Sequence, residues 1–174
     1  MAAPAIKVYT GVLYAALNWP TLTKAAQKKG EKSLVIISAK YGAVGPLEKI
    51  KSYKATIENS KLKDQVAAVL DPRQDELIID CRSSTYQGVW SAPYKNCIEI
   101  RVFQNVNGTK RVVTHMSKKT RGEVARLILA HKSIPKTPRE VRDIVNKQYS
   151  CALIQWDSFK PWVLEVIAHE NNPA

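Results

Sequence analysis

Two short, continuous apolar runs constrain the fold of this chain more than any other feature. Residues 34–37 and 77–79 are rich in β-branched side chains without polar alternation, a pattern typical of strands buried inside a sheet. A helix-like segment precedes each run, and a polar, turn-rich loop follows it. We expect the first helix, in "TLTKAAQKKG", to end at Gly30, and the second, in "IENSKLKDQVAAVL", to stop before Asp71-Pro72. This alternation predicts an α/β or mixed α+β domain, with helices flanking a mixed sheet.

The remaining segments carry signals of both strands and helices. The opening "IKVYTGVLYAAL" begins with a strand-like run, and "NCIEIRVFQNVNGTKRVVTHMS" alternates apolar and polar residues around Asn107-Gly108, which predicts an antiparallel hairpin. After a Pro-containing linker, "SIPKTPREV", we expect a helix through about Lys147. The last apolar stretch, "CALIQWDSFKPWVLEVIA", is either strand or helix, because Pro161 breaks a helical pattern. We expect one domain over residues 1–174, since a chain that is 45% hydrophobic can bury one core at this length.

The charge balance and the absence of several signals narrow the class of protein. Lys and Arg number 27 against 15 Asp and Glu, which gives a net charge of +12 and favours polyanionic partners such as nucleic acid or nucleotides. No apolar stretch reaches membrane-spanning length and the N-terminus lacks a signal-peptide pattern, so we expect a cytoplasmic protein without membrane contact. Neither a disulfide framework, a metal site nor a cofactor is indicated, because the relevant residues are scattered: Cys81, Cys97, Cys151, His115, His131 and His169. Of these, His131 is interpreted as a satisfied core residue.

The polar loops that follow the two apolar runs are the first candidates for a ligand site. In open sheets flanked by helices, ligands gather beyond the carboxyl ends of the strands. These loops offer cations and hydroxyls for a phosphate or carboxylate, and tyrosines that can stack on a base. The residues concerned are Ser38, Lys40, Tyr41 and Gly42 in the first loop and Arg82, Ser83, Ser84 and Tyr86 in the second.

The segment "SKKTRGEVARLILAHK", residues 117–132, carries apolar residues at helical spacing. Thr120 and Glu123 are spaced as a capping box, so we expect a helix to begin there. Its first turn would then carry three cations, Lys118, Lys119 and Arg121. Each is unfavourable beside the positive end of the helix dipole, by about 0.3–1 kcal/mol when exposed. A bound anion would offset this cost, and Gly122 would let it approach the backbone; the alternative is a solvated face that Thr120 alone caps.

The chain also offers weak candidates for catalysis and stacking. Cys81 follows a strand and precedes Arg82, which could lower the pKa of its thiol, although a buried structural thiol is the favoured interpretation. Asp80 is the best single acid for proton transfer, but a capping or turn role is favoured over it. Trp156 and Trp162 are either core residues, which we favour, or an exposed stacking pair.

Four segments of the chain together resemble a known protein family. "VYTGV", "SAKYGAVGPLEKIKSY", "LIIDCRSSTY" and "NGTKRVVTHMSKKTRGEVARLIL" are similar, in that order and spacing, to segments of the peroxide stress protein YaaA family. The corresponding family segments are VYTG, LYG…RPLD…PY, a strand followed by an S-x-x-Y loop, and a hairpin leading to a KK-x-RG helix. The match covers most of residues 8–130. The positions it implies are Tyr9, Thr10, Gly11, Tyr41, Gly42, Pro46, Leu47, Tyr53, Ser83, Tyr86, Lys118, Lys119, Arg121 and Gly122.

The resemblance implies a cytoplasmic protein associated with peroxide resistance and with limiting free iron, in a family with a DNA-binding member. The chain also differs from the family pattern at several positions. This chain starts near the VYTG segment, so we expect the contribution of the family's N-terminal region, with its SPAKT segment, to be absent. Thr85 stands where an acidic residue is expected, and Arg82 where a small residue is usual, so chemistry that depends on that acid is in doubt.

Three functions remain open at this point. The leading hypothesis is a stress protein that binds nucleic acid, with DNA favoured over RNA, or another phosphate-bearing ligand. The alternatives are an enzyme acting on a nucleotide or nucleobase in the same site, and a non-catalytic interaction module. The oligomeric state is left open. The candidate binding residues are Tyr9, Thr10, Gly11, Ser38, Lys40, Tyr41, Gly42, Arg82, Ser83, Tyr86, Lys118, Lys119, Arg121 and Gly122, with Asp80 and Cys81 as the weak catalytic candidates.

Overall fold

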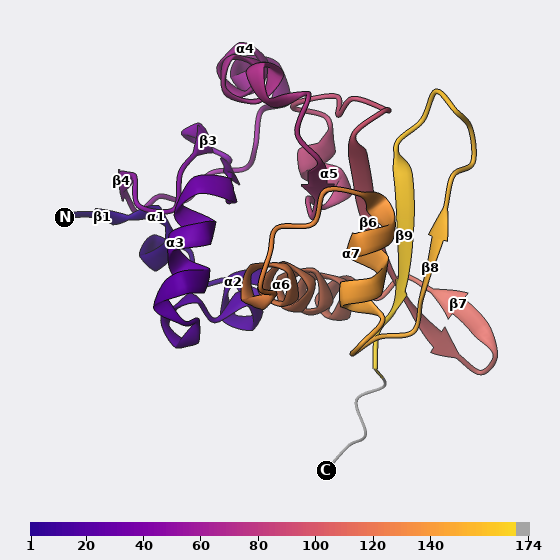
Figure 1. Ribbon diagram of the computed structural model, residues 1–174. Helices are drawn as coiled ribbons and strands as arrows, with labels where there is room; N and C mark the ends of the chain where they lie inside the picture. The colour runs from indigo at the N-terminus through magenta and orange to yellow at the C-terminus, as the bar shows by residue number, and fades with distance from the viewer. Residues whose placement is uncertain (170–174) are drawn as a thin grey trace.

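The N-terminal part of the chain combines short helices with two small antiparallel sheets. A computed structural model describes residues 1–169 (Figure 1). The elements of this part are β1 (Ala2–Pro4), α1 (Ala5–Val8), α2 (Val12–Leu17), α3 (Lys24–Ser33), β2 (Ile36–Ser38), β3 (Gly42–Val44) and β4 (Lys49–Lys51), with a 3₁₀ turn at Trp19–Thr21. Strand β1 pairs with β4, and β2 forms a tight hairpin with β3.

The C-terminal part is built on a five-stranded mixed sheet. Its elements are α4 (Asn59–Leu70), a 3₁₀ turn (Asp71–Arg73), β5 (Ile78–Asp80), α5 (Ser84–Gln87), β6 (Cys97–Val106), β7 (Thr109–Arg111), α6 (Thr114–Ala130), α7 (Pro138–Val145), β8 (Cys151–Ile154) and β9 (Trp162–Ile167). The strand order is β5-β6-β9-β8, and β7 pairs with the end of β6. Strands β5, β6 and β9 run parallel, while β7 and β8 are antiparallel to their neighbours. The predicted α+β class, with a mixed sheet and flanking helices, is confirmed.

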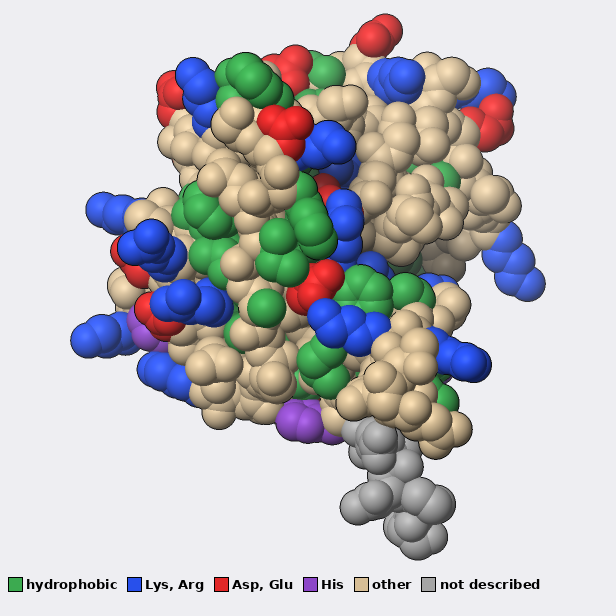
Figure 2. Space-filling model, turned by 90° about the vertical axis from the view of Figure 1, so that its right-hand side faces the viewer, with side chains coloured by type: hydrophobic (Ala, Val, Ile, Leu, Met, Phe, Trp, Pro, Cys, Tyr) green, Lys and Arg blue, Asp and Glu red, His purple; other side chains and the backbone are tan. Residues whose placement is uncertain are grey.

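The two faces of this sheet have different environments. Alternate residues of β6, Ile98, Ile100 and Val102, are buried in a core with side chains of α6 and α7, and Figure 1 shows both helices on that side. The opposite face carries two ion pairs, Arg101–Glu99 at 3.0 Å and Lys110–Glu165 at 2.7 Å. Figure 2 shows hydrophobic side chains on that side of the molecule, with charged side chains among them.

Several predicted elements are confirmed. Asn107 and Gly108 both have positive φ, 50° and 78°, as a two-residue hairpin turn between β6 and β7 requires. Helix α4 ends at Leu70, before Asp71-Pro72, and α7 occupies the segment where a helix through about Lys147 was expected. The last apolar stretch forms two strands, which decides the open alternative between strand and helix.

Other predictions were wrong, mostly because tertiary packing overrides a local pattern. The strand-like opening run lies largely in α1 rather than in a strand. Helix α3 continues through Gly30 to Ser33, and Gly30 is packed so tightly that a Cβ would lie 2.5 Å from the Trp19 ring. Trp156 is 65% exposed instead of lying in the core, whereas Trp162 is partly buried against it. Both polar loops also contain structure, namely β3 in the first and α5 in the second.

Helix α6 begins seven residues earlier than its capping-box pattern predicts. Its first residue is Thr114, and Ser117 N–H already donates to the Val113 carbonyl at 2.8 Å. Thr120 is therefore an interior residue, 1% exposed, and not a cap. The chain leaves the β6–β7 hairpin almost directly into the helix, so the three cations lie beyond its first turn. The predicted conflict with the helix dipole is absent, because that effect fades within the first turn.

Gly122 serves the contact between α6 and α2. A Cβ at this position would lie 2.1 Å from the Leu13 carbonyl oxygen and 2.9 Å from Ala16 Cβ. Only a glycine therefore allows the two helices to approach this closely. The prediction that Gly122 opens the backbone to an anion was wrong, since helix α2 occupies that space.

No helix in the described part of the chain is both long and apolar enough to cross a bilayer.

Candidate functional site

Three hydroxyl groups from separate segments form a chain of hydrogen bonds, here called the hydroxyl chain: Ser38, Tyr53 and Tyr9. Ser38 Oγ lies 2.7 Å from the Tyr53 hydroxyl, which lies 3.0 Å from the Tyr9 hydroxyl. Ser38, at the end of β2, is buried, and its Oγ also accepts N–H groups of the following turn. The Ala39 N–H donates to the Tyr53 hydroxyl at 3.0 Å. The first strand-end loop thus holds a buried polar network rather than a solvated loop.

Five of the tyrosines gather around this chain, and we call them the tyrosine cluster: Tyr9, Tyr14, Tyr41, Tyr53 and Tyr86. Tyr9 stacks on Tyr14 with ring centroids 5.1 Å apart, and Tyr41 meets Tyr53 edge-on at 5.5 Å. Burial first, and then the nearby Tyr86 and Tyr53, raises the pKa of Tyr14 above its ordinary value. Burial likewise raises the pKa of Tyr9 and of Tyr86. All three phenols therefore stay protonated at neutral pH and remain hydrogen-bond donors.

Several of these hydroxyls have no acceptor in the part of the chain that the structure describes. Among residues 1–169, no oxygen accepts from the hydroxyl of Tyr14 or Tyr86, whereas the Tyr9 hydroxyl bonds Tyr53 and also interacts with Ser38. Tyr41 differs, because its hydroxyl donates to the Lys51 carbonyl at 3.2 Å. The hydroxyls of Tyr14 and Tyr86 are accessible to solvent, because Asn59 Oδ1 is the only buried side-chain polar atom without a partner in the described residues. Their concentration in one cluster indicates a place where a polar ligand could bind.

The second strand-end loop is organised by an ion pair between Asp80 and Arg82. Arg82 Nη2 lies 2.7 Å from Asp80 Oδ2, and the side chains are 12% and 6% exposed. Arg82 Nε and its backbone N–H both donate to Asp80 Oδ1. The third nitrogen, Nη1, donates to backbone carbonyls of Tyr86 and Trp90 at 3.2 and 3.0 Å. Every nitrogen of this guanidinium is engaged, so Arg82 fixes the α5 turn, and Asp80 has the turn role that the sequence favoured.

The thiol of Cys81 is not activated. Burial raises its pKa from 9.0 to about 12, with a further increase from Asp80 that Arg121 opposes. The suggestion that Arg82 lowers this pKa was therefore wrong, and the structural interpretation of Cys81 is supported. In the described residues, no group of three His, Cys, Asp or Glu side chains is placed to hold a metal ion.

Arg121 contrasts with Arg82. It projects from α6, is half-buried, and its Nε donates to the Ile100 carbonyl at 3.3 Å. Within the described chain, neither terminal nitrogen has an acceptor, and no carboxylate lies within ion-pair distance. Burial lowers the pKa of Arg121, and the nearby Cys81, Asp80 and Glu99 oppose that effect. A guanidinium that is partly desolvated but unpaired is suited to an incoming anion.

Arg121 and the tyrosine cluster are carried by neighbouring elements of the molecule. Helix α2 contacts α6 at Gly122, where Leu13 lies against the glycine, and Tyr14 and Arg121 are the next residues along the two helices. Tyr86 lies near Tyr14 and is fixed by the ion pair that follows β5, which in turn lies near Arg121. We define the candidate site as the tyrosine cluster together with Ser38 and Arg121.

Some of the residues predicted from the sequence lie in the candidate site, and others lie outside it. Those that lie in the candidate site are Tyr9, Ser38, Tyr41, Tyr86 and Arg121. Ser83 is at the start of α5 but makes no capping bond. The others lie outside it: Thr10, Gly11, Lys40 and Lys118 are exposed, and Lys119 is half-buried.

Gly42 has a structural role instead. Its φ is +71°, and a Cβ would lie 1.8 Å from the Gln65 side chain. Gln65 bonds both backbone groups of Ala43, at 2.7 and 3.1 Å, which ties α4 to the hairpin.

Two members of the candidate site were missed or undervalued. Tyr53 was implied only by the family resemblance and was absent from the candidate list. Tyr14 lies in an apolar helical segment, "VLYAAL", where an aromatic residue reads as core. No spacing in the sequence distinguishes it, and only the stacking on Tyr9 does so.

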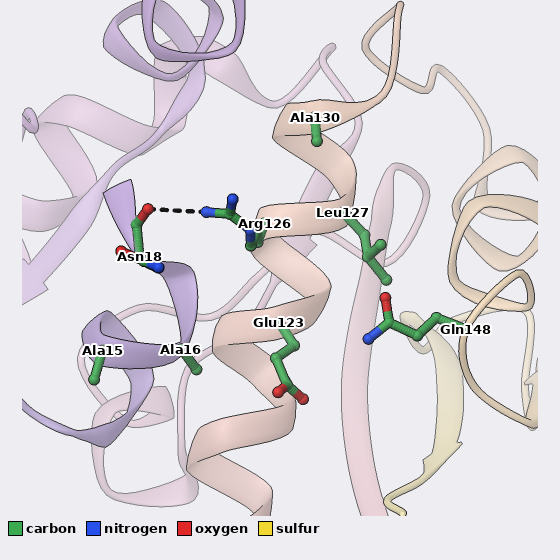
Figure 3. Close-up of a pocket in the computed structure, with 8 residues that line it drawn as sticks. All are labelled: Ala15, Ala16, Asn18, Glu123, Arg126, Leu127, Ala130 and Gln148. Carbon is green, nitrogen blue, oxygen red and sulfur yellow. Dashed lines mark hydrogen bonds between the residues drawn. The ribbon is translucent and has the colours of Figure 1, made fainter. Parts of the chain in front are cut away.

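A separate groove lies between α2, α6 and the end of α7, with a volume of about 430 Å³. Figure 3 shows its lining residues: Ala15, Ala16, Asn18, Glu123, Arg126, Leu127, Ala130 and Gln148. Arg126 points to the end of α2 and donates to the Leu17 and Asn18 carbonyls at 2.9 and 2.8 Å. Glu123 accepts from the Tyr149 hydroxyl. The charged groups of this groove are engaged in holding the helices, and none of the predicted binding residues lines it.

Comparisons with known proteins agree on one family. The model of the peroxide stress protein YaaA family matches residues 1–153. A UPF0246 protein of Streptomyces coelicolor is 30% identical over 97% of this chain, and one of Corynebacterium efficiens is 35% identical over 81%. A third, from Shewanella halifaxensis, is 27% identical over 74%. This chain spans 70%, 60% and 56% of these relatives respectively. The chain therefore belongs to the peroxide stress protein YaaA family.

Proposed function

We propose that this chain binds a phosphate-bearing ligand at Arg121 and acts in the response to peroxide stress. The ligand is a nucleotide unit, either free or part of a nucleic acid, and DNA is favoured over RNA. The observation that carries the proposal is the half-buried guanidinium of Arg121, whose terminal nitrogens have no acceptor in the described chain.

Phosphate is the ligand chemistry that suits Arg121 best. The planar guanidinium can donate two parallel hydrogen bonds to phosphate oxygens, and such charge-assisted bonds are stronger than neutral ones. Carboxylate binding is geometrically similar, but the surroundings favour a ligand with an aromatic part. Tyr9 and Tyr14 present stacked rings on a neighbouring element, and the Tyr14 hydroxyl has no acceptor among the described residues, as a base and its sugar would require.

A nucleic acid is supported by the charge of the whole chain. The net charge of +12 favours long polyanions over small anions, because each phosphate contact releases counterions. Lys118 is exposed on the same helix as Arg121, three residues away. It can contact a neighbouring phosphate of a strand whose first phosphate lies at Arg121.

Binding is favoured over thiolate catalysis at this site. The raised pKa of Cys81, about 12, leaves little thiolate at neutral pH, so this thiol is a poor nucleophile. Asp80 is neutralised by its ion pair with Arg82. The alternative of an enzyme acting on a nucleotide therefore has no activated group among the candidates that the sequence provided.

Fluorescence anisotropy with labelled single-stranded and duplex DNA tests the binding proposal. Arg121→Gln should weaken binding by roughly tenfold to a hundredfold, the size expected for one lost charge-assisted contact. Arg139→Gln is the matched control, since Arg139 is exposed on α7 and the net charge falls equally. Measurements at two salt concentrations separate phosphate contacts from other interactions. No binding at low salt, or equal weakening in both variants, would overturn the proposal.

The connection to peroxide stress rests on the family and needs a test in cells. A strain lacking this protein should be more sensitive to hydrogen peroxide than its parent. The unaltered gene should restore resistance, as should the gene carrying Arg139→Gln, whereas Arg121→Gln should not. Unchanged sensitivity in the deletion strain would separate this chain from the role that the family name describes.

A further inference from the structure

The directions of the hydrogen bonds in the hydroxyl chain follow from counting donors and acceptors. Ser38 Oγ accepts the N–H groups of Lys40 and Tyr41, at 3.3 and 3.1 Å, which occupies both of its lone pairs. Its own O–H must then donate, and the Tyr53 hydroxyl lies at 2.7 Å. Ser38 is therefore the donor in this pair.

The same argument fixes the next bond. The Tyr53 oxygen receives the Ala39 N–H at 3.0 Å and the Ser38 O–H, so its own proton is directed to Tyr9, 3.0 Å away. Tyr9 is then an acceptor from Tyr53, and its proton has no acceptor within residues 1–169. The backbone of the β2–β3 turn thus orients a series of protons that ends in one outward donor.

We propose that the Tyr9 hydroxyl is a directed donor that selects ligands with an acceptor oxygen, the oxo group of a nucleobase, over ligands with an amino group at that position. This inference rests on the proposed function, which puts a phosphate at Arg121 and a base near the tyrosines. An oxo group accepts the outward proton. An amino group offers no acceptor for that proton, and it could donate only to the remaining lone pair of Tyr9.

The geometry offers variants that separate the hydroxyl from the ring. Tyr9→Phe removes the terminal donor and retains a ring that can stack on Tyr14. Tyr53→Phe breaks the chain, so that Tyr9 is no longer held as an acceptor and can present either a lone pair or its proton. Tyr94→Phe is the matched control, because Tyr94 is exposed and packs against Phe159, outside the tyrosine cluster.

Calorimetric titration with paired ligands tests the proposal. Inosine monophosphate and adenosine monophosphate differ in having an oxo or an amino group at the same ring position. The unaltered protein should bind the inosine compound about threefold to tenfold more tightly, as one neutral hydrogen bond allows. Tyr94→Phe should retain this preference, Tyr53→Phe should reduce it, and Tyr9→Phe should abolish it.

The same titrations distinguish failure of this inference from failure of the phosphate site. Arg121→Gln should weaken both nucleotides equally and leave their ratio unchanged, and inosine and adenosine without phosphate should keep the preference. If Arg121→Gln changes neither affinity while the preference persists, the phosphate site is wrong and the directed donor stands. Equal affinities within each pair, a preference that survives Tyr9→Phe, or no binding of any nucleotide or nucleoside would overturn the directed donor.

Discussion

Two arginines lie near the carboxyl end of β5, and the protein uses their donors differently. Arg82 bonds Asp80 through two nitrogens and backbone carbonyls through the third. Arg121 gives one nitrogen to the Ile100 carbonyl, and its others have no acceptor in the described chain. Both are at least half-buried. A position near a strand end therefore does not identify an arginine that binds a ligand. Donor groups without acceptors are the better indication.

The largest expected difference between the two arginines is in stability. Arg82→Met leaves the 6%-exposed Asp80 without its partner, and breaking a buried pair from one side costs about 3–5 kcal/mol. Arg121→Met removes a partly desolvated, unpaired charge and should change the free energy of unfolding by less than about 1 kcal/mol. Urea unfolding of both variants measures this difference. Equal losses would remove the distinction between a structural and a binding arginine.

The reactivity of Cys81, which precedes Arg82 and lies near Arg121, gives a second test of this part of the structure. Because the pKa of Cys81 is raised from 9.0 to about 12, iodoacetamide at pH 8 should alkylate it at least about a hundredfold more slowly in the folded than in the unfolded protein. Peptide mapping by mass spectrometry identifies the modified cysteine.

The sign of the pH dependence follows from the same shift. The folded state holds the Cys81 proton more tightly than the unfolded state does. Its contribution to stability is therefore present below pH 9 and is lost as the pH rises toward 12. Rapid alkylation of the folded protein at pH 8 would contradict both the shift and the structural role of Cys81.

The helix contact beside Arg121 should be intolerant of a larger residue. Gly122→Ala brings a Cβ to 2.1 Å from the Leu13 carbonyl oxygen, so α2 and α6 must separate, at a cost of about 1–3 kcal/mol. Gly45→Ala is the control, since nothing lies within 4 Å of a Cβ there. Thermal and urea unfolding would compare the two. A Gly122→Ala variant as stable as Gly45→Ala would show that this contact does not position Arg121.

The smallest effect is expected from the neighbouring lysines. Replacing Lys118 and Lys119 together with Gln should alter the free energy of unfolding by no more than about 0.5 kcal/mol, because both lie beyond the first turn of α6. The salt dependence of DNA binding should become shallower by about one or two counterions. A clear gain in stability would instead support the predicted unfavourable interaction of these lysines with the helix dipole.

The sequence predicted features that are determined locally and missed those that depend on distant contacts. Asn107-Gly108 suffices for a hairpin. The apolar runs form strands, but the prediction that they lie inside a sheet was wrong, because β2 belongs to a two-stranded hairpin and β5 is at the edge of its sheet. Thr120 and Glu123 imitate a cap, but the exit of the preceding hairpin at Val113 decides where α6 begins. A sequence pattern cannot show that the protein's own turn satisfies Arg82, because the carbonyls concerned gain their positions only when α5 folds.

The candidate site shows the same division. Ser38 and Tyr86 follow strands and were accessible to pattern reasoning, and Tyr9 and Tyr53 were implied by the family resemblance. Tyr14 was not, because its position in α2 has the apolar surroundings of a core residue. Its role emerges from a ring 5.1 Å away in another segment, a contact that only the assembled fold creates.

The most direct test of the central claim, that Arg121 is an anion site, is the response of thermal stability to phosphate at matched ionic strength. The unaltered protein and Arg139→Gln should both gain melting temperature as phosphate replaces chloride, because an anion that binds only the folded state stabilises it. Arg121→Gln should show no such gain. An identical phosphate response in all three proteins would contradict the claim, and the unpaired guanidinium would then be a feature of the fold without a ligand.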